Sequence, residues 1–92
     1  MNYTVTWAPE AENGLATAWL AAPDRNAVTA ASHRLDQDLA TDPYARGVAR
    51  NASVNRTAVE LPLGIDYKII EDDRRVCVLV VWSLILLEDK GR

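Results

Sequence analysis

Basic side chains in the second half of the chain are the groups best suited to chemistry on a phosphate. Residues 43–56 carry three arginines and no acidic residue, and further cations follow. Arginine and lysine bind phosphate oxygens and stabilise the charge that develops when RNA is cleaved, but cleavage also needs a group that transfers protons. We therefore predict contacts with a target or with phosphate, and no catalytic residue, at Arg50, Arg56, Tyr67, Lys68 and Arg75. Arg56 and Lys68 are expected on the same face of a sheet, and ordinary surface charge is the alternative for the whole set.

The other side chains of chemical interest favour structural roles. His33 is the only histidine and is flanked by polar residues, so a surface position on a helix is expected. Cys77, the only cysteine, stands in an apolar run, which is typical of core packing. Asp72 and Asp73 are adjacent, a pattern more typical of a solvated hairpin turn than of a metal site. The sequence contains no Cys/His cluster, glycine-rich phosphate loop or Ser–His–Asp set, so neither a metal nor a cofactor is predicted.

Charge and composition indicate which kinds of protein this chain can be. The formal net charge is −3, and phosphate affinity comes from accumulated Lys and Arg, so the balance disfavours direct nucleic-acid binding. A chain of 92 residues with 49% hydrophobic residues is expected to form one domain, residues 1–92. The beginning of the chain does not resemble a secretory signal, and the longest apolar stretch, residues 76–87, is too short to span a bilayer as a helix. A cytoplasmic protein without membrane contact is therefore expected.

The pattern of the first half predicts a strand followed by a helical hairpin. Residues 3–7 alternate apolar and polar types, as a strand does, and Pro9 suits the first turn of a helix. The apolar face of that helix consists of Ala11, Leu15, Ala18, Trp19 and Ala22. Asp24 is the expected N-cap of a second helix, which ends before Pro43. Its apolar face consists of Val28, Ala31, Leu35 and Leu39. Because the link is short, the two helices should lie antiparallel.

The second half predicts a polar loop at residues 44–55 and then three strands. The strands are expected at residues 56–61, 65–70 and 76–84, with a turn or bulge at residues 62–64 and a charged hairpin turn at residues 71–74. Residues 76–84 are apolar almost throughout, which is typical of an interior strand covered on both faces. Residues 84–92 are expected to be a strand remnant or a flexible tail. The fold class is therefore α+β, in the order strand–helix–helix–strand–strand–strand, with the helical hairpin packed on one face of a small, mostly antiparallel sheet.

Tryptophans and the apolar end of the chain predict a core and a partner-binding surface. Trp19 is expected in the core between helix and sheet, whereas Trp82 could serve either as core or as an anchor for a partner. Residues 84–87 are apolar and could leave hydrophobic surface that a partner covers. The predicted partner-binding residues are Trp82, Leu84 and Leu86.

Three segments together resemble the RelE/ParE superfamily of bacterial toxins. The segments are Tyr3–Ala11, where a strand runs into a helix through a proline and acidic junction, Leu63–Ile69, a strand with a tyrosine before an acidic turn, and Arg75–Trp82, a hydrophobic last strand. The resemblance implies the toxin of a type II toxin–antitoxin module, a growth inhibitor of the plasmid-stabilising kind. It also implies a cognate antitoxin that wraps a segment across the toxin and neutralises it.

The resemblance implies two possible activities. RelE-like members cut messenger RNA on the ribosome, whereas ParE-like members poison DNA gyrase by protein contact. Gly64 stands where RelE-like chains commonly carry an arginine, three positions before the strand tyrosine, and residues 83–87 lack their basic residues and tyrosine. These departures favour a ParE-like inhibitor that is not an enzyme. An mRNA endoribonuclease of RelE type and a non-toxic partner-binding homologue are the alternatives.

Overall fold

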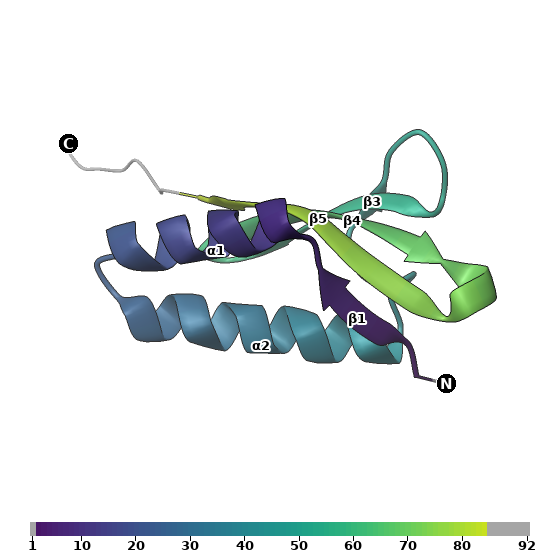
Figure 1. Ribbon diagram of the computed structural model, residues 1–92, viewed down its shortest axis with the longest axis horizontal. Coiled ribbons are helices and arrows are strands. Elements are labelled where there is room, and N and C mark those ends of the chain that lie inside the picture. Colours follow the sequence, from purple (N-terminus) through teal and green to yellow (C-terminus); the bar gives the residue numbers. More distant parts are fainter. Residues whose placement is uncertain (1, 85–92) are drawn as a thin grey trace.

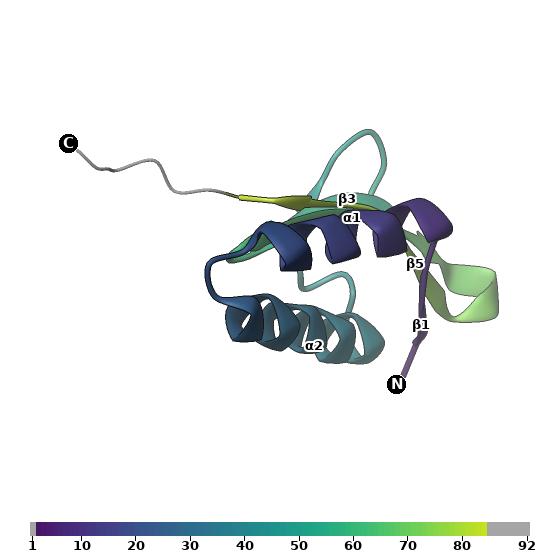
Figure 2. The same ribbon diagram turned by 60° about the vertical axis from the view of Figure 1, so that its left-hand side comes forward.

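Two helices lie on one side of a five-stranded sheet. The computed structural model describes residues 2–84 of the chain. The elements follow in the order strand, helix, helix and then the remaining strands, and the sheet order is β1-β5-β4-β3-β2. Both helices cover the same face, and the other face carries no helix within the described residues (Figures 1 and 2). The predicted α+β class and the helical hairpin on one face are confirmed.

A short first strand leads directly into the helical hairpin. Strand β1 (Thr4–Trp7) is followed by helix α1 (Pro9–Ala21), and helix α2 (Arg25–Thr41) runs back beside it (Figure 1). Proline suits the first turn of α1 because the backbone N–H it lacks would have no partner there. The predicted N-cap of α2 is confirmed, since the Asp24 carboxylate accepts a hydrogen bond from the backbone N–H of Ala27 at 3.3 Å.

The other strands build an antiparallel ladder onto which β1 adds in parallel. They are β2 (Val48–Ala49), β3 (Asn55–Glu60), β4 (Leu63–Ile70) and β5 (Arg75–Ser83), with a 3₁₀ turn at Glu71–Asp73 between the last two. β1 pairs with the first half of β5 in parallel. Each of the strands from β2 to β5 pairs antiparallel with the next strand along the chain. The sheet is therefore mostly antiparallel, as expected.

The predicted boundaries of two segments are wrong. Residues 44–55, expected as loop throughout, contain the short strand β2, because Gly47 adopts a positive φ of 69° and turns the chain back against β3. Residues 62–64, expected as a turn, include the start of β4. Glu60 pairs with Leu63 across the sheet, so the turn contains only the two residues between them.

The core lies between the helical hairpin and the sheet. The predicted apolar face of α2 is confirmed, because its four residues are at most 1% exposed. Facing them from β4 are Ile65, Tyr67 and Ile69, also buried. Each fully buried leucine, isoleucine or valine contributes about 1.5–3 kcal/mol of hydrophobic free energy, so this layer supplies most of the driving force for folding.

Strand β5 is an interior strand, but only one of its faces is covered by helices. Val76, Val78 and Val81 point toward the helices and are buried. On the opposite face Leu79 is 39% exposed and Trp82 is half-buried. The prediction of an interior strand is confirmed, and the prediction of cover on both faces is wrong for the described residues. The apolar run therefore supplies core residues on one face and, with Leu79 and Trp82, part of an uncovered sheet surface on the other.

Helix α1 packs closely against the backbone of β5. A Cβ atom added to Gly14 would collide with the backbone carbonyl of Val81. Glycine costs about 1 kcal/mol relative to alanine inside a helix. Here its missing side chain lets the helix cover the part of β5 that extends beyond β1, whose pairing ends at Val78.

Candidate functional site

Most of the predicted target contacts meet in one groove at the β3–β4 side of the sheet. The groove encloses about 450 Å³ and is lined by Arg50, Asn51, Asn55, Arg56, Asp66, Tyr67, Lys68 and Leu79. Four of the five predicted contact residues are in that set. The fifth, Arg75, does not line the groove and lies at the start of β5, where it forms an ion pair with Asp73 at 3.8 Å.

Both arginines of the groove are already bonded within the protein. The Arg50 guanidinium donates to Thr57 Oγ1 at 3.2 Å and forms an ion pair with Asp66 at 3.4 Å. The Arg56 guanidinium donates to three backbone carbonyls of residues 46–53, at 2.9, 3.0 and 3.3 Å. Arg56 therefore holds the β2 segment against β3, and a phosphate would have to displace these bonds to reach it.

Tyr67 is a buried structural residue of this region. Its side chain is 1% exposed, and its hydroxyl lies 2.8 Å from the backbone oxygen of Pro43 and 2.7 Å from that of Arg46. Burial raises the pKa of the phenol above its ordinary value of 10, so the hydroxyl stays protonated and donates to these oxygens. Tyr67 thus anchors the segment between α2 and β2.

Lys68, like Arg50, is an exposed cation of the groove. Within the described residues it forms no ion pair. The expectation that it shares a sheet face with Arg56 is wrong, because the ladder pairs Arg56 with Tyr67 and Lys68 with Asn55. Successive residues of a strand point to opposite faces, so the two cations leave the sheet on opposite sides. The two-residue turn before Leu63 sets this register.

Trp82 occupies the space that a larger residue at position 64 would need. Gly64 and Trp82 are paired across β4 and β5, and both point to the open face. A Cβ atom on Gly64 would lie 2.5 Å from two atoms of the indole ring. The indole therefore packs directly on the glycine backbone. An arginine at position 64 is incompatible with this placement of Trp82.

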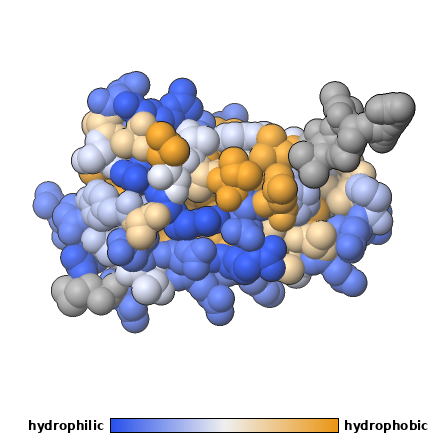
Figure 3. Space-filling model, turned by 180° about the vertical axis from the view of Figure 1, so that it is seen from behind, coloured by the Kyte–Doolittle hydropathy of each residue, from blue (hydrophilic) through white to orange (hydrophobic). Residues whose placement is uncertain are grey.

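The open face also carries the predicted partner-binding residues. Trp82 and Leu84 are half-buried, and Leu86 lies outside the described residues, as does the rest of the predicted tail at residues 85–92. Close to them in the ladder, Val59 and Leu61 are each 50% exposed. Apolar side chains gather in one area of the molecule seen from behind (Figure 3). Uncovered apolar surface of this kind marks interaction sites in soluble proteins.

The structure places Cys77 on the open sheet face and His33 on helix α2. Cys77 points to the open face between β1 and β4 and is half-buried, so the prediction of a fully buried core thiol is wrong. His33 is exposed on α2, as predicted. Among the described residues no group of His, Cys, Asp and Glu side chains could hold a metal ion, and no helix is long and apolar enough to cross a membrane.

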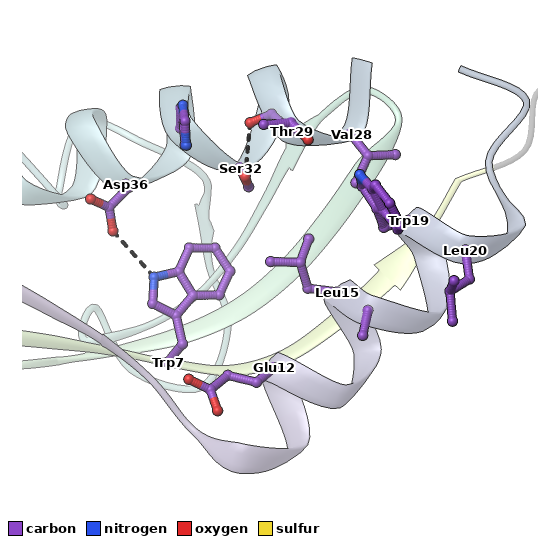
Figure 4. Close-up of a pocket in the computed structure, with 11 residues that line it drawn as sticks. Trp7, Glu12, Leu15, Trp19, Leu20, Val28, Thr29, Ser32 and Asp36 are labelled. Atoms are coloured by element: carbon purple, nitrogen blue, oxygen red, sulfur yellow. Dashed lines mark hydrogen bonds between the residues drawn. The ribbon is translucent and has the colours of Figure 1, made fainter. Parts of the chain in front are cut away.

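A second hollow, which the sequence did not reveal, lies between the two helices. It encloses about 650 Å³ and is lined by Trp7, Glu12, Leu15, Ala16, Trp19, Leu20, Val28, Thr29, Ser32, His33 and Asp36. Leu15 projects into the space between α1 and α2 (Figure 4). The prediction that Trp19 belongs to the core is wrong: its indole is 39% exposed, and Arg25 stacks on it at 4.6 Å from the ring centre. Helical spacing placed Trp19 on the apolar face but could not show how much of that face the second helix covers.

An ion-pair network joins α2, the 43–46 segment and the end of β3. Glu60 pairs with Arg34 at 2.6 Å and with Arg46 at 2.9 Å. The hydrogen bond from Arg34, helped by the charge of Arg46, lowers the pKa of the Glu60 carboxyl below its ordinary value. The network holds the 43–46 segment in place, and the groove-lining residues Arg50 and Arg56 come shortly after this segment in the chain.

Solved structures that share this architecture include toxins and toxin–antitoxin complexes. A chain of the RelBE2 toxin–antitoxin complex from Mycobacterium tuberculosis superposes with a TM-score of 0.70 at 19% identity, over 90% of this chain and 92% of that one. A chain of the chromosomal ParDE toxin–antitoxin system from P. aeruginosa gives 0.66 at 11% identity, over 90% and 97%. The isolated E. coli RelE toxin gives 0.65 at 16% identity, over 94% and 88%.

This chain has the RelE/ParE toxin fold. No protein-family model and no curated protein sequence matches it. Both RelE and ParE structures superpose on the chain at similar scores, so the fold does not separate the two branches. The function must therefore be argued from the side chains of this chain: the bonded arginines, the Gly64–Trp82 contact and the two uncovered apolar surfaces.

Proposed function

We propose that the chain is the toxin of a bacterial type II toxin–antitoxin module and that it inhibits growth by binding a protein target, with DNA gyrase as the first target to test. The RelE/ParE fold supports the toxin role, and the uncovered apolar face supports binding to proteins. We place the protein in the cytoplasm, where such a target works.

The contact between Trp82 and Gly64 carries the preference for a non-enzymatic mechanism. RNA cleavage requires cations placed at the phosphate and a group that transfers protons. Position 64, where RelE-like chains commonly carry an arginine, is closed by the indole. The arginines of the groove are already bonded: Arg56 donates to backbone carbonyls, and Arg50 forms an ion pair with Asp66. What remains is a surface suited to binding rather than to acid–base catalysis.

The open sheet face is the proposed seat of the cognate antitoxin. Val59 on β3 and Trp82 on β5 both pair with Gly64, on the strand between them. Leu61 and Leu84 follow the ends of β3 and β5, and the predicted contact Leu86 lies outside the described residues. A segment laid across this face would bury them, which supplies affinity in proportion to the apolar area removed from water. Co-expression with the neighbouring small open reading frame should raise the soluble yield and give a co-purifying pair. An unchanged yield with no co-purification would contradict this assignment.

Growth and supercoiling assays test the function together. Induction of the chain alone should stop growth, and co-expression of the antitoxin should restore it. Antitoxin-free protein at micromolar concentration should inhibit DNA supercoiling by purified gyrase. Growth arrest without gyrase inhibition would remove gyrase as the target, and harmless expression of folded protein would favour the non-toxic homologue instead.

The exposed position of Lys68 favours the second candidate, a ribosome-dependent mRNA endoribonuclease. Lys68 lies in the groove beside Asp66 and Arg50, where it could reach a phosphate. This candidate predicts cleaved transcripts in arrested cells and relief of toxicity by Lys68→Ala. Arg56→Ala should relieve toxicity as well, but its bonds to residues 46–53 mean that the variant must first be shown to fold.

A further inference from the structure

The hollow between the two helices, here called the helix groove, is formed by small residues facing each other. Ala16 on α1 and Thr29 and Ser32 on α2 line it, and none of these side chains is large enough to fill the space between the helices. Larger apolar side chains also line it: Leu15 projects into the space between the helices, and Trp19 lies beside Val28 (Figure 4). The result is an open channel along the hairpin, on the side of the molecule away from the exposed sheet face.

The polar groups of the groove wall are already satisfied. The Ser32 hydroxyl donates to the backbone oxygen of Thr29 at 2.8 Å, and the Thr29 hydroxyl donates to that of Arg25 at 3.2 Å. The indole N–H of Trp7 donates to Asp36 at 3.2 Å. Because these donors need no new partner, covering the wall with apolar side chains costs little desolvation.

The edge of the groove is negatively charged. Glu12 stands on the α1 side and Asp36 on the α2 side, and neither forms an ion pair within the described residues. The nearby arginines are engaged elsewhere: Arg25 donates to two backbone oxygens and stacks on Trp19, and Arg34 pairs with Glu60. The hairpin, residues 9–41, carries five acidic side chains and two basic ones, a net charge of −3. An apolar floor between two carboxylates repels an acidic ligand and attracts a basic one.

We infer that the helix groove docks a basic amphipathic helix of a partner protein, with leucine-sized side chains in the channel and lysine or arginine side chains at Glu12 and Asp36. The lining runs from Glu12 to Leu20 along α1, about 12 Å at 1.5 Å per residue. That length matches about two helical turns and therefore anchors at positions i, i+3 and i+7. Trp19, half-exposed at the channel end, is the residue type most enriched in binding hot spots.

A pair of synthetic helical peptides tests this inference on the full chain. Both peptides are alanine-based with leucines at positions i, i+3 and i+7; one carries lysines beside them and the other glutamates in the same places. Binding is followed by tryptophan fluorescence, since neither peptide contains tryptophan. The lysine peptide should bind saturably, on the order of tenfold more tightly than the glutamate peptide, because Glu12 and Asp36 attract its lysines and repel the glutamates.

Three variants locate the binding and its charge dependence. Ala16→Arg puts a long side chain into the channel at an exposed position and should abolish binding, whereas the matched control Thr17→Arg, exposed on the same helix outside the lining, should not. The double variant Glu12→Lys/Asp36→Asn keeps an oxygen acceptor for Trp7 but makes the edge positive, so the preference should shift to the glutamate peptide.

Equal binding of both peptides, no saturable binding, or equal effects of Ala16→Arg and Thr17→Arg would overturn the inference. So would a dimer of the chain that Ala16→Arg converts to monomer, because a second copy would then occupy the groove. The inference does not depend on toxicity: growth arrest with failed peptide binding removes the groove inference alone, and peptide selectivity without growth arrest removes the proposed function alone.

Discussion

Replacing Gly64 with alanine should destabilise the protein only while Trp82 is present. The added Cβ would lie 2.5 Å from the indole, whereas ordinary contact begins at 3.4 Å, so the ring must retreat by about 0.9 Å. Overpacking of this kind costs about 1–3 kcal/mol. Alanine regains about 0.5–1 kcal/mol over glycine in a strand because it loses less conformational entropy. The expected net loss of unfolding free energy is about 1–2 kcal/mol.

A double-mutant cycle isolates the contact. In a Trp82→Ala background the clash is gone, so Gly64→Ala should become neutral or stabilise by up to about 1 kcal/mol, which gives a coupling energy of about 1–3 kcal/mol. In a Leu79→Ala background, a neighbouring truncation on the same strand, Gly64→Ala should keep its cost. Urea unfolding with an unchanged m-value measures all of these. Additive effects of Gly64→Ala and Trp82→Ala, within about 0.5 kcal/mol, would refute the claim that the indole closes position 64.

Three further changes test the packing and the charge network. Gly14→Ala should destabilise the protein in urea unfolding despite the better helix propensity of alanine, because its Cβ meets the backbone oxygen of Val81; a gain in stability would show that the helix is free to move. Tyr67→Phe should cost about 1–2 kcal/mol in the same assay, since it leaves the buried backbone carbonyl of Pro43 without its donor, whereas that of Arg46 keeps the bond from Arg56; no loss would mean that water replaces the hydroxyl. The hydrogen bond from Arg34 lowers the pKa of Glu60 in the folded state, so the stability it contributes is complete above the unfolded pKa and is lost as the pH falls through the folded value. Glu60→Gln should therefore flatten the acid limb of a stability–pH profile, and identical acid limbs would contradict this.

The sequence predicted the architecture because each element has its own local signal. Proline at the first turn of α1, the Asp24 cap of α2 and the 3.6-residue spacing of Val28, Ala31, Leu35 and Leu39 are all local, and the structure confirms them. From the hydrophobic run of β5 we predicted a strand covered on both faces, and only one face is covered by helices. Periodicity reports that a side chain is apolar, and not whether a second layer exists to cover it.

The site was predicted less well because it depends on register and on the distance between elements. Arg56 and Lys68 looked like a pair, but the two-residue turn sets a ladder that puts them on opposite faces. No local pattern shows how closely α1 and α2 pack, so the helix groove and the exposure of Trp19 were missed. The Gly64–Trp82 contact joins residues far apart in sequence, although the glycine itself was a visible signal.

Messenger RNA in growth-arrested cells gives the most direct test of the central claim that this toxin-fold protein acts by binding and not by cutting RNA. The 5′ ends of ribosome-bound transcripts are mapped before and after induction of the chain without the proposed antitoxin. We predict that growth stops while the transcripts stay intact. New 5′ ends within codons, appearing as growth stops and disappearing in Lys68→Ala, would contradict the account and identify the chain as an endoribonuclease.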